Sequence, residues 1–215
     1  MPLRYDAVLF DLLTALLDSW TLWDRVAGSS ARGRFWREAY LRYTYATGMY
    51  RPYETLLAEA AVQAGCPASW ADNLVERWGE LEPWPGVVET VNRLCEGAKI
   101  GVVTNCSEKL ARLAADRVGE FDVIVSAERA GYYKPHEQPY RLALEEMGTA
   151  PGQTLFVAGS AYDLAGAAQV GMPVFWHNHV GMNVPPGTPP PLAESSDIIS
   201  LWELVTAMNS GPESP

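Results

Sequence analysis

The sequence predicts an α/β protein in which helices cover both faces of a parallel sheet and one helical insertion interrupts the pattern. Two observations support this fold class. Short apolar runs of strand length alternate with segments of helical periodicity, which is typical of doubly wound parallel sheets. Between residues 19 and 84 the alternation stops, because this stretch has helical periodicity and contains no convincing strand.

Five buried strands are expected. Each is a short apolar run of the kind that lies buried on both faces of a parallel sheet. The runs are Tyr5–Phe10, Lys99–Thr104, Phe121–Ser126, Thr154–Ala158 and, as the last strand, Pro173–Trp176. Functional groups of such Rossmann-like sheets gather at the carboxyl ends of the strands. The polar residues that follow the strands are therefore candidates for a site.

Helical segments separate these strands. Pro85 suits the first turn of an amphipathic helix, and Ser107 can cap a helix that continues to Val118. The proline-rich stretch 185–191 predicts a semi-rigid surface loop, and the final segment, Gly211–Pro215, is expected to be disordered. Further helices are expected at Gln138–Met147, Leu164–Val170 and Leu201–Met208.

The insertion divides the chain into two expected parts. Residues 1–18 and 85–215 form an α/β core, and residues 19–84 form a helical cap beside the carboxyl ends of the strands. The cap is rich in aromatic residues and Arg. Such aromatics are more often core or subunit contact than substrate wall, although Trp36 and Tyr40 are candidates to line a small apolar pocket.

Composition argues against several function classes. The 215 residues include 16 Lys and Arg against 26 Asp and Glu, which gives a net charge of −10. An acidic chain is not expected to bind nucleic acid or an anionic membrane surface, because both interactions depend on basic residues. The apolar N-terminal run is interrupted by acids and is expected to be folded protein rather than a signal peptide or membrane span. Three cysteines without paired spacing indicate the reducing cytoplasm.

Five polar residues follow the expected strands and turns. Asp11 directly follows the first strand, where a carboxylate is costly to bury without a cation or a chemical role, although Asp is also a common helix cap. Thr104 and Asn105 lie at the end of the second strand, Lys134 lies in a turn, and Asp163 follows the fourth strand. Taken singly, Lys134 is typical of a surface lysine and the others of helix caps.

Taken together, these residues occur in the order of a known set of motifs. The sequence resembles the haloacid dehalogenase superfamily from Tyr5 to about Leu204. The resemblance implies that the helical insertion is the cap of that superfamily. It also implies that Asp11 is a nucleophile that forms an ester with the substrate, while Lys134 holds its charge. The matching positions are Asp11, Thr104-Asn105, Lys134-Pro135 and Ser160-x-x-Asp163.

Two missing acids separate the chain from the phosphatases of this superfamily. Phosphatases carry a second Asp two residues after the nucleophile, which protonates the departing alkoxide. They also carry an Asp in the fourth motif that binds Mg²⁺ together with the nucleophile. These positions are Leu13 and Gly159 in this chain. The negative charge of a phosphoryl group must be neutralised by such an acid and a metal ion, whereas a halide leaves as a weak base and needs neither. No cofactor is therefore expected for a dehalogenase. Mg²⁺ is expected only if the protein is a phosphatase.

The cap segment points to a branch of the superfamily that lacks both of these acids. Residues Phe35–Thr44 resemble the cap helix of the L-2-haloacid dehalogenases, in which an Arg engages the halogen or the substrate anion. That role carries over to Arg37, since a guanidinium suits a small carboxylate or a departing halide. Tyr140 matches a Tyr that this branch carries six residues after the Lys.

The chain departs from this branch at several site positions. Leu13 replaces a Tyr, Ala158 replaces a Ser and Ser160 replaces an Asn. In the branch, that Ser and Asn help to hold the Lys and the water that cleaves the ester. Thr104 replaces a Ser but keeps the hydroxyl. A substrate other than a 2-haloacid, with a related electrophilic carbon that the same carboxylate attacks, is an alternative.

The leading hypothesis is a metal-independent hydrolase that displaces halide from a small 2-haloacid. Asp11 attacks the carbon, Lys134 pairs with Asp11, and Asp163 orients Lys134 or the water that cleaves the ester. The expected substrate-binding residues are Arg37, Thr104, Asn105, Leu13, Ser160 and Tyr140. Two alternatives stay open: a phosphatase acting on a small phosphate ester, and a non-catalytic member that keeps the fold for binding. The expected partner is a small anionic organic molecule, and the resemblance implies a homodimer.

Two other features are expected to be structural. His177 and His179 form a His-x-His pair after a strand, but no further ligand cluster accompanies them, so a loop is favoured over a metal site. Cys106 has no activating His in a suitable context and is expected to be a small buried residue.

Overall fold

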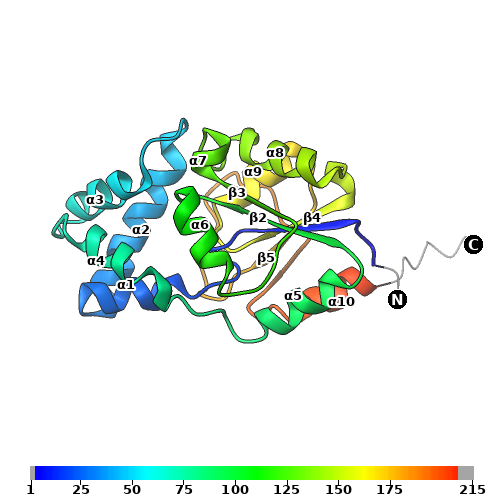
Figure 1. The fold of residues 1–215 in the computed structure, drawn as a ribbon, viewed down its shortest axis with the longest axis horizontal. Helices are drawn as coiled ribbons and strands as arrows, with labels where there is room; N and C mark the ends of the chain where they lie inside the picture. Colours follow the sequence, from blue (N-terminus) through cyan, green and yellow to red (C-terminus); the bar gives the residue numbers. More distant parts are fainter. Residues whose placement is uncertain (1–2, 208–215) are drawn as a thin grey trace, which may run out of the picture.

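The structure is a computed structural model that describes residues 3–207. Helices flank a central sheet, and a separate group of helices lies beyond one end of it (Figure 1). The strands are β1 (Ala7–Phe10), β2 (Lys99–Thr104), β3 (Val123–Ser126), β4 (Thr154–Ala158), β5 (Val174–His177) and β6 (Ala193–Ser195). The helices are α1 (Ser19–Ala27), α2 (Ser30–Thr47), α3 (Tyr53–Gln63), α4 (Trp70–Glu76), η1 (Trp78–Glu80), α5 (Val87–Cys95), α6 (Glu108–Ala115), α7 (Ala127–Ala130), α8 (Glu137–Met147), η2 (Pro151–Gln153), α9 (Asp163–Val170) and α10 (Ser200–Thr206).

The sheet is parallel throughout, with the strand order β3-β2-β1-β4-β5-β6. This order confirms the predicted doubly wound, Rossmann-like α/β class. At the centre, Phe10 of β1 pairs with Val102 of β2 on one side and with Val157 of β4 on the other. The order of the strands reverses here, so the carboxyl ends of β1, β2 and β4 border the crevice in which such sheets hold their ligands.

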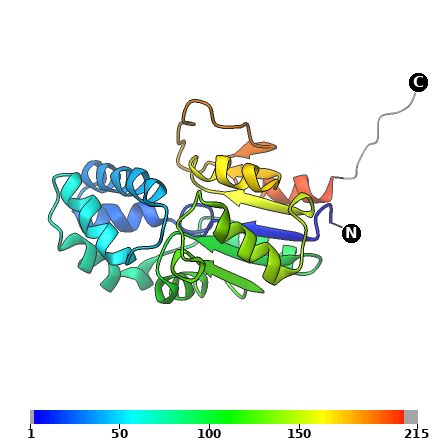
Figure 2. The ribbon, with the colours of Figure 1, turned by 90° about the horizontal axis from the view of Figure 1, so that it is seen from above.

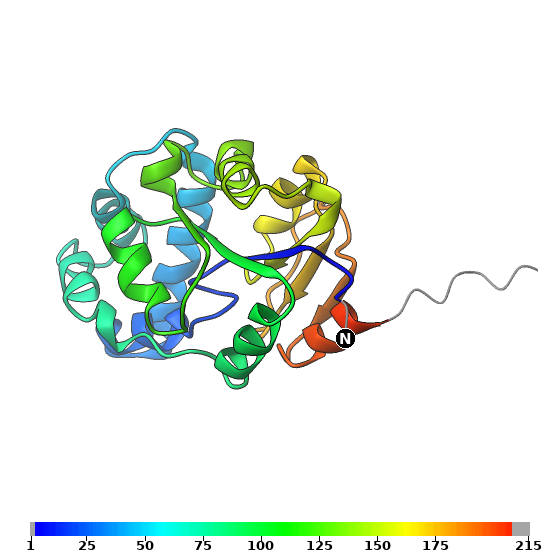
Figure 3. The same ribbon diagram turned by 45° about the vertical axis from the view of Figure 1, so that its right-hand side comes forward.

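Alternate residues of the strands face two hydrophobic layers. Val8 and Phe10 of β1 pack in the layer that includes α5, α6 and α10. Ala7 and Leu9 pack in the layer formed with α8 and α9. The two helical layers lie on opposite faces of the sheet (Figure 1), and α5 and α10 lie side by side (Figure 3). Burial on both faces explains why the strands are continuous apolar runs in the sequence.

The helices from α1 to η1 lie beyond the carboxyl ends of the strands (Figure 2). Residues 19–84 contain no strand. The interior of this helical group is aromatic: Trp23 packs against Trp36, Tyr40 and Trp78 with ring centroids 5.7, 5.9 and 6.0 Å apart. Trp36 is fully buried in this cluster, so it belongs to the core of the insert rather than to a pocket wall. The division into core and cap remains an interpretation of this arrangement.

The first two helices of the insert form a tight hairpin. Asp18 caps the start of α1 with its carboxylate, and Gly28 ends the helix with φ +71°, a conformation that favours glycine. At the contact between the helices, a Cβ on Gly33 would lie 2.3 Å from Asp24 Oδ1 and 2.5 Å from Asp24 Cα. The close approach of α1 and α2 therefore requires a residue without a side chain at position 33.

The end of the sheet differs from the prediction. β5 extends to His177 and is not the last strand, because β6 pairs with it in parallel. The six-stranded sheet thus gains an edge strand of only three residues, which has no apolar run in the sequence. Residues 185–191 lie in the connection between β5 and β6, and the predicted disorder of Gly211–Pro215 falls outside the described residues.

Helix boundaries also differ, and the differences at α5 and α6 have a structural reason. Pro85 precedes α5, because Gly86 with φ +78° stands between the proline and the first helical residue. α6 ends at Ala115 rather than at Val118, and the hydroxyl of Ser107 donates to Glu54 at 3.0 Å instead of capping the helix. Along residues 3–207, none of the helices combines the length and the apolar character needed to cross a bilayer.

The contact at Gly33 predicts that alanine at this position destabilises the protein, although helix propensity alone predicts that it stabilises α2. Alanine favours a helix interior over glycine by about 1 kcal/mol. Because the new methyl group would meet the backbone of Asp24, Gly33→Ala is instead expected to lower the free energy of unfolding by about 1–3 kcal/mol. Chemical denaturation measures this change. Gly79→Ala is the control, since a Cβ at Gly79 meets nothing within 4 Å; equal stability of both variants would contradict the packing at position 33.

Candidate active site

The candidate residues converge at the carboxyl ends of the central strands. Asp11 directly follows β1, Asn105 directly follows β2, and Asp163 begins α9 shortly after β4. Lys134 lies in the connection between α7 and α8. Because β1 lies between β2 and β4, the parallel sheet brings these residues to one crevice.

Asp11 organises the turn that follows β1. Its Oδ2 accepts hydrogen bonds from the N–H groups of Thr14 and Ala15, at 2.9 and 3.1 Å, and from the Thr14 hydroxyl at 2.7 Å. Asp11 therefore caps this turn, and its other oxygen, Oδ1, remains available to a different partner. Thr14 was not predicted as a site residue. The signal that could have revealed it is an Asp followed three residues later by a Thr, a spacing that lets both groups bond.

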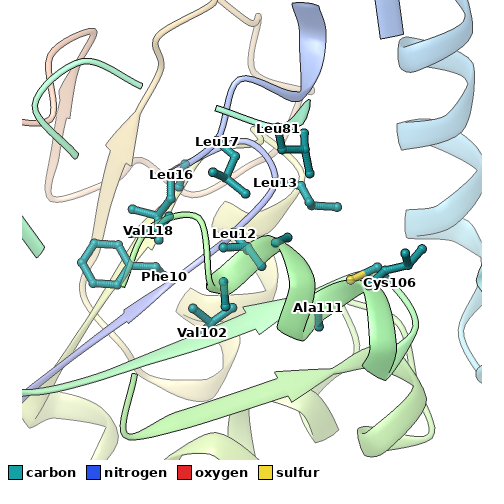
Figure 4. Close-up of a cluster of buried hydrophobic side chains, with 14 of the residues drawn as sticks. Phe10, Leu12, Leu13, Leu16, Leu17, Leu81, Val102, Cys106, Ala111 and Val118 are labelled. Carbon is teal, nitrogen blue, oxygen red and sulfur yellow. The ribbon is translucent and has the colours of Figure 1, made fainter. Parts of the chain in front are cut away.

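The same turn is fixed by apolar side chains. Leu12, Leu13, Leu16 and Leu17 follow β1 and lie in a hydrophobic cluster near Leu81 (Figure 4). Leu13 is buried, so the position of the second phosphatase acid is occupied by hydrocarbon.

Lys134 links the two carboxylates of the site. Its Nζ lies 2.8 Å from Asp11 Oδ1 and 3.0 Å from Asp163 Oδ1, and the side chain is fully buried. Burial alone would lower the pKa of Lys134, but the charges of both carboxylates and their hydrogen bonds raise it overall. Burial alone would raise the pKa of Asp11, but the charge of Lys134 and the hydrogen bonds from Lys134 and Thr14 lower it overall. The pair is therefore ionised at neutral pH.

Asp163 is the weaker acid of the two. Burial and the charge of Asp11 raise its pKa to about 6, even though Lys134 and a hydrogen bond from Tyr45 act in the opposite direction. The Tyr45 hydroxyl donates to Asp163 Oδ1 at 2.7 Å, and the Tyr140 hydroxyl lies 3.5 Å from the same oxygen. Asp163 Oδ2 is buried and has no hydrogen-bond partner in the described chain. One oxygen of Asp163 can therefore accept a further proton.

Two tyrosines lie against Asp163. The buried hydroxyl of Tyr140 is directed at Asp163, and its expected role in substrate binding stays a prediction. Tyr45 was not predicted, because it is one of ten tyrosines and one of many aromatic residues in the insert. The available signal was its position on α2, the same helix that carries Arg37, about two turns further along the chain.

Asn105 holds the backbone of Lys134. Its Oδ1 accepts the Lys134 N–H at 2.7 Å, and its Nδ2 donates to the Lys134 carbonyl at 3.1 Å. Both polar atoms of its amide thus position Lys134, and the expected role of Asn105 as a substrate ligand stays a prediction.

The other predicted hydroxyls have local partners. The Thr104 hydroxyl lies 3.8 Å from the sulfur of Cys106, and the Ser160 hydroxyl accepts the N–H of Tyr162 at 3.3 Å. A role for either in substrate binding stays a prediction. Burial raises the pKa of the Cys106 thiol, which fits a buried structural cysteine rather than a nucleophile.

Arg37 is a buried cation on α2. Its Nη2 donates to the Ser19 hydroxyl at 2.9 Å, and that hydroxyl donates in turn to the Leu13 carbonyl in the turn after β1. The guanidinium carbon lies 4.4 Å from the ring centroid of Trp23 and 4.9 Å from that of Tyr40. Arg37 Nε and Nη1 have no partner among the described residues. A buried guanidinium with two unsatisfied donors is costly unless an anion binds there.

The residues present do not fit the magnesium site of the phosphatases. At the position of the fourth-motif acid, a Cβ on Gly159 would lie 2.0 Å from Ala15 N and 2.2 Å from the carbonyl carbon of Thr14. The backbone of the turn after β1 fills the space of that ligand. Over the part of the chain that the structure describes, Asp, Glu, His and Cys side chains nowhere gather in a group of three or more suited to a metal ion.

The His-x-His pair contributes to the same turn. His177 is the last residue of β5 rather than part of a loop, and its Nδ1 lies 2.7 Å from the Ala15 carbonyl oxygen. Burial lowers the pKa of His177, so the neutral ring donates to Ala15 from this nitrogen. His179 lies in the following loop and stacks on Trp84 with centroids 4.0 Å apart.

Comparisons with known proteins agree with this architecture. The chain is 29% identical to an (S)-2-haloacid dehalogenase of Pseudomonas putida, over 69% of this chain and 71% of the relative. It is 27% identical to (S)-2-haloacid dehalogenase 4A of Burkholderia cepacia, over 93% and 94% of the two chains. It is also 29% identical to the pyrimidine 5'-nucleotidase YjjG of Escherichia coli strain K12, over 63% and 68%.

A crystal structure of a dehalogenase superposes with a TM-score of 0.81 at 25% identity, over 95% of this chain and 98% of that chain. The L-2-haloacid dehalogenase of Xanthobacter autotrophicus, solved with chloropropionic acid covalently bound, shares the fold with a TM-score of 0.81 at 19% identity, over 93% and 98%. The family model for haloacid dehalogenase-like hydrolases matches residues 5–171. The chain therefore belongs to the haloacid dehalogenase-like hydrolases, in the branch of the L-2-haloacid dehalogenases.

Proposed function

We propose that this protein is a metal-independent hydrolase that displaces halide from a short 2-haloacid. The observation that carries the proposal is Arg37, a buried guanidinium with two unsatisfied donors. It is linked through Ser19 to the turn that holds Asp11. A small organic anion supplies the negative charge that this guanidinium lacks. The named activity of the (S)-2-haloacid dehalogenase relatives supports the same substrate class.

In the first step, a carboxylate oxygen of Asp11 attacks the carbon that bears the halogen. Oδ2 accepts three hydrogen bonds, whereas Oδ1 accepts one, from Lys134. Oδ1 therefore keeps more lone-pair density and is the attacking atom. A bond forms between Oδ1 and carbon, and the carbon–halogen bond breaks with its electron pair on the halide. Arg37 stabilises the substrate carboxylate and the developing halide.

This step requires no general acid, because a halide is a weak base. The buried Leu13 supplies an apolar wall at the position of the phosphatase acid, and a dry wall strengthens the electrostatic contacts of the site. The steric overlap at Gly159 supports a reaction that uses Lys134, rather than a metal ion, to hold the charge of Asp11.

In the second step, water cleaves the ester. The water oxygen attacks the Asp11 carboxyl carbon while one of its protons passes to Asp163 Oδ2. The bond between that carbon and the ester oxygen then breaks, and the departing oxygen takes the proton from Asp163 to leave as the hydroxyl of the hydroxy acid. The second water proton is released to solvent as Asp11 returns to its carboxylate. Asp163 suits this role because Oδ2 has no other partner and because its pKa of about 6 leaves it ionised at neutral pH. Tyr45 and Lys134 hold the other oxygen, Oδ1, and so orient the carboxylate.

A phosphatase is the second candidate, because the nucleotidase YjjG is among the relatives. It would have to act without the general acid and without the metal ligand of the phosphatases, because Leu13 and Gly159 occupy those two positions. A non-catalytic binding protein is the third candidate. The cytoplasmic location and the homodimer remain predictions.

The first test is halide release. Incubation with 2-chloropropionate and excess EDTA is expected to release chloride, and Asp11→Asn is expected to reduce the rate on the order of 10⁴-fold, because the amide is a poor nucleophile. Chloride titration measures the rate. Asp72→Asn, an exposed position on α4, is the matched control and should keep full activity.

Two outcomes of this test would contradict the proposal. Magnesium-dependent cleavage of a phosphate ester, with no halide from any 2-chloro or 2-bromo acid, would identify a phosphatase. The absence of both activities would favour the binding protein.

The second test is the pH dependence of turnover. Because burial and Asp11 raise the pKa of Asp163 to about 6, turnover is expected to rise through about pH 6 and to level off above it. Below that pH, protonated Asp163 cannot accept the proton of water. Tyr45→Phe removes a hydrogen bond that lowers this pKa, so the acidic limb should move to higher pH.

Tyr132→Phe is the control for the tyrosine variant, because Tyr132 stacks on His136 outside the site. Asp163→Asn should accumulate the Asp11 ester, which mass spectrometry detects as a covalent adduct. An acidic limb that does not respond to Tyr45→Phe, together with no adduct in Asp163→Asn, would remove Asp163 from the hydrolytic step.

A further inference from the structure

A cavity of about 390 Å³ opens beside the candidate active site. Its walls come from α1, α2, the residue before α9 and the segment 180–183 after β5. The wall includes two arginines, Arg34 and Arg42, and one acid, Glu38. None of the residues assigned to the reaction lines it. The cavity is therefore distinct from the site of Asp11, Lys134 and Arg37.

Three wall residues link the cavity to that site. The ring centroid of Trp20 lies 5.7 Å from the guanidinium carbon of Arg34 and 5.7 Å from that of Arg37. Leu41 is one helical turn after Arg37 on α2, and Tyr162 directly precedes Asp163. Trp20, Leu41 and Tyr162 thus line the cavity and lie close, in space or along the chain, to residues assigned to the reaction.

The reacting groups themselves are closed to solvent. Asp11, Arg37 and Lys134 are 3%, 1% and 0% exposed. A substrate must therefore reach them through a part of the surface that moves or already opens. Trp20 lines the cavity, and its ring centroid lies 5.7 Å from the guanidinium carbon of Arg37. An anion held in the cavity is therefore one side chain away from that cation.

The charge of the wall favours anions in a protein that otherwise repels them. The chain carries a net charge of −10, and this field slows the approach of a carboxylate. Arg34 is partly neutralised by Glu38, with Arg34 Nε 4.0 Å from Glu38 Oε1. Arg42 takes part in none of the ion pairs formed within residues 3–207. The cavity wall therefore has an excess of one positive charge, carried by a free guanidinium.

We propose that this cavity is an entry site that binds the carboxylate of a small organic acid before the acid passes Trp20 to Arg37. Arg42 provides the main attraction, Arg34 assists, and Glu38 opposes. The proposal deepens the proposed function, on which it rests for the identity of the substrate. It assigns the capture of the anion to residues of α2 that take no part in the chemical steps.

The test uses the full chain and a halogen-free probe, propionate. Calorimetry is expected to show that Arg42→Gln weakens propionate binding about 3- to 10-fold at low salt, as expected for one partly screened charge. Glu38→Gln should strengthen it about 2-fold. Both effects should shrink in high salt, because screening shortens the reach of exposed charges. In turnover assays with 2-chloropropionate, Arg42→Gln should raise KM by the same factor and leave kcat unchanged.

Arg32→Gln is the matched control, because Arg32 is on the same helix but stacks over Trp70, away from the cavity. It should bind propionate as the unmodified protein does. Propionate binding that is absent, or that is equal in Arg42→Gln, Glu38→Gln and Arg32→Gln, would overturn the entry site even if the protein releases halide. Binding that depends on Arg42 would support the entry site even if no haloacid is turned over, and in that case only the proposed function would fail.

Discussion

The site depends on one interaction: the ammonium of Lys134 lies between the carboxylates of Asp11 and Asp163, with no surface exposed. Buried charges are costly unless they are paired and hydrogen-bonded. Here two carboxylates share one cation, so they become unequal: Asp11 is stabilised as an anion and Asp163 becomes the weaker acid. Asn105 fixes the backbone of the lysine, and Tyr45 crosses from the insert to hold Asp163. One shared cation thus gives two identical side chains different chemistry.

The sequence was sufficient for the parts of the fold that depend on burial. β2 and β4 have the bounds expected from their apolar runs, because the interior positions of strands buried on both faces are apolar. β6 could not be predicted in this way: it has three residues, lies at the edge, and forms only because β5 offers an unpaired edge. Its existence is a property of the assembled sheet rather than of its own residues.

Within the site, residue identity was predictable and contact geometry was not. Asp11, Lys134 and Asp163 follow strands or turns at positions that a resemblance can match. By contrast, the amide of Asn105 reaches a backbone 29 residues away in the sequence, and the hydroxyl of Tyr45 reaches an acid 118 residues away. The first contact depends on how two loops of the core meet, and the second on how the insert packs on the sheet. No local pattern encodes either placement, which is why the contact of Asn105 with Lys134 was not foreseen and Tyr45 was not identified.

The close contact at Gly159 has a consequence for how the activities of this family are separated. An acid at position 159 and the present backbone at Ala15 cannot occupy the same space. The exchange of Leu13 for an acid alters only a side chain, but an acid at 159 requires the turn after β1 to be rebuilt first. A mutational path from this chain to a metal-dependent relative therefore needs a shift of this backbone together with the substitution at position 159. Libraries that vary side chains alone would stop there, while libraries that also vary the length of this turn would not.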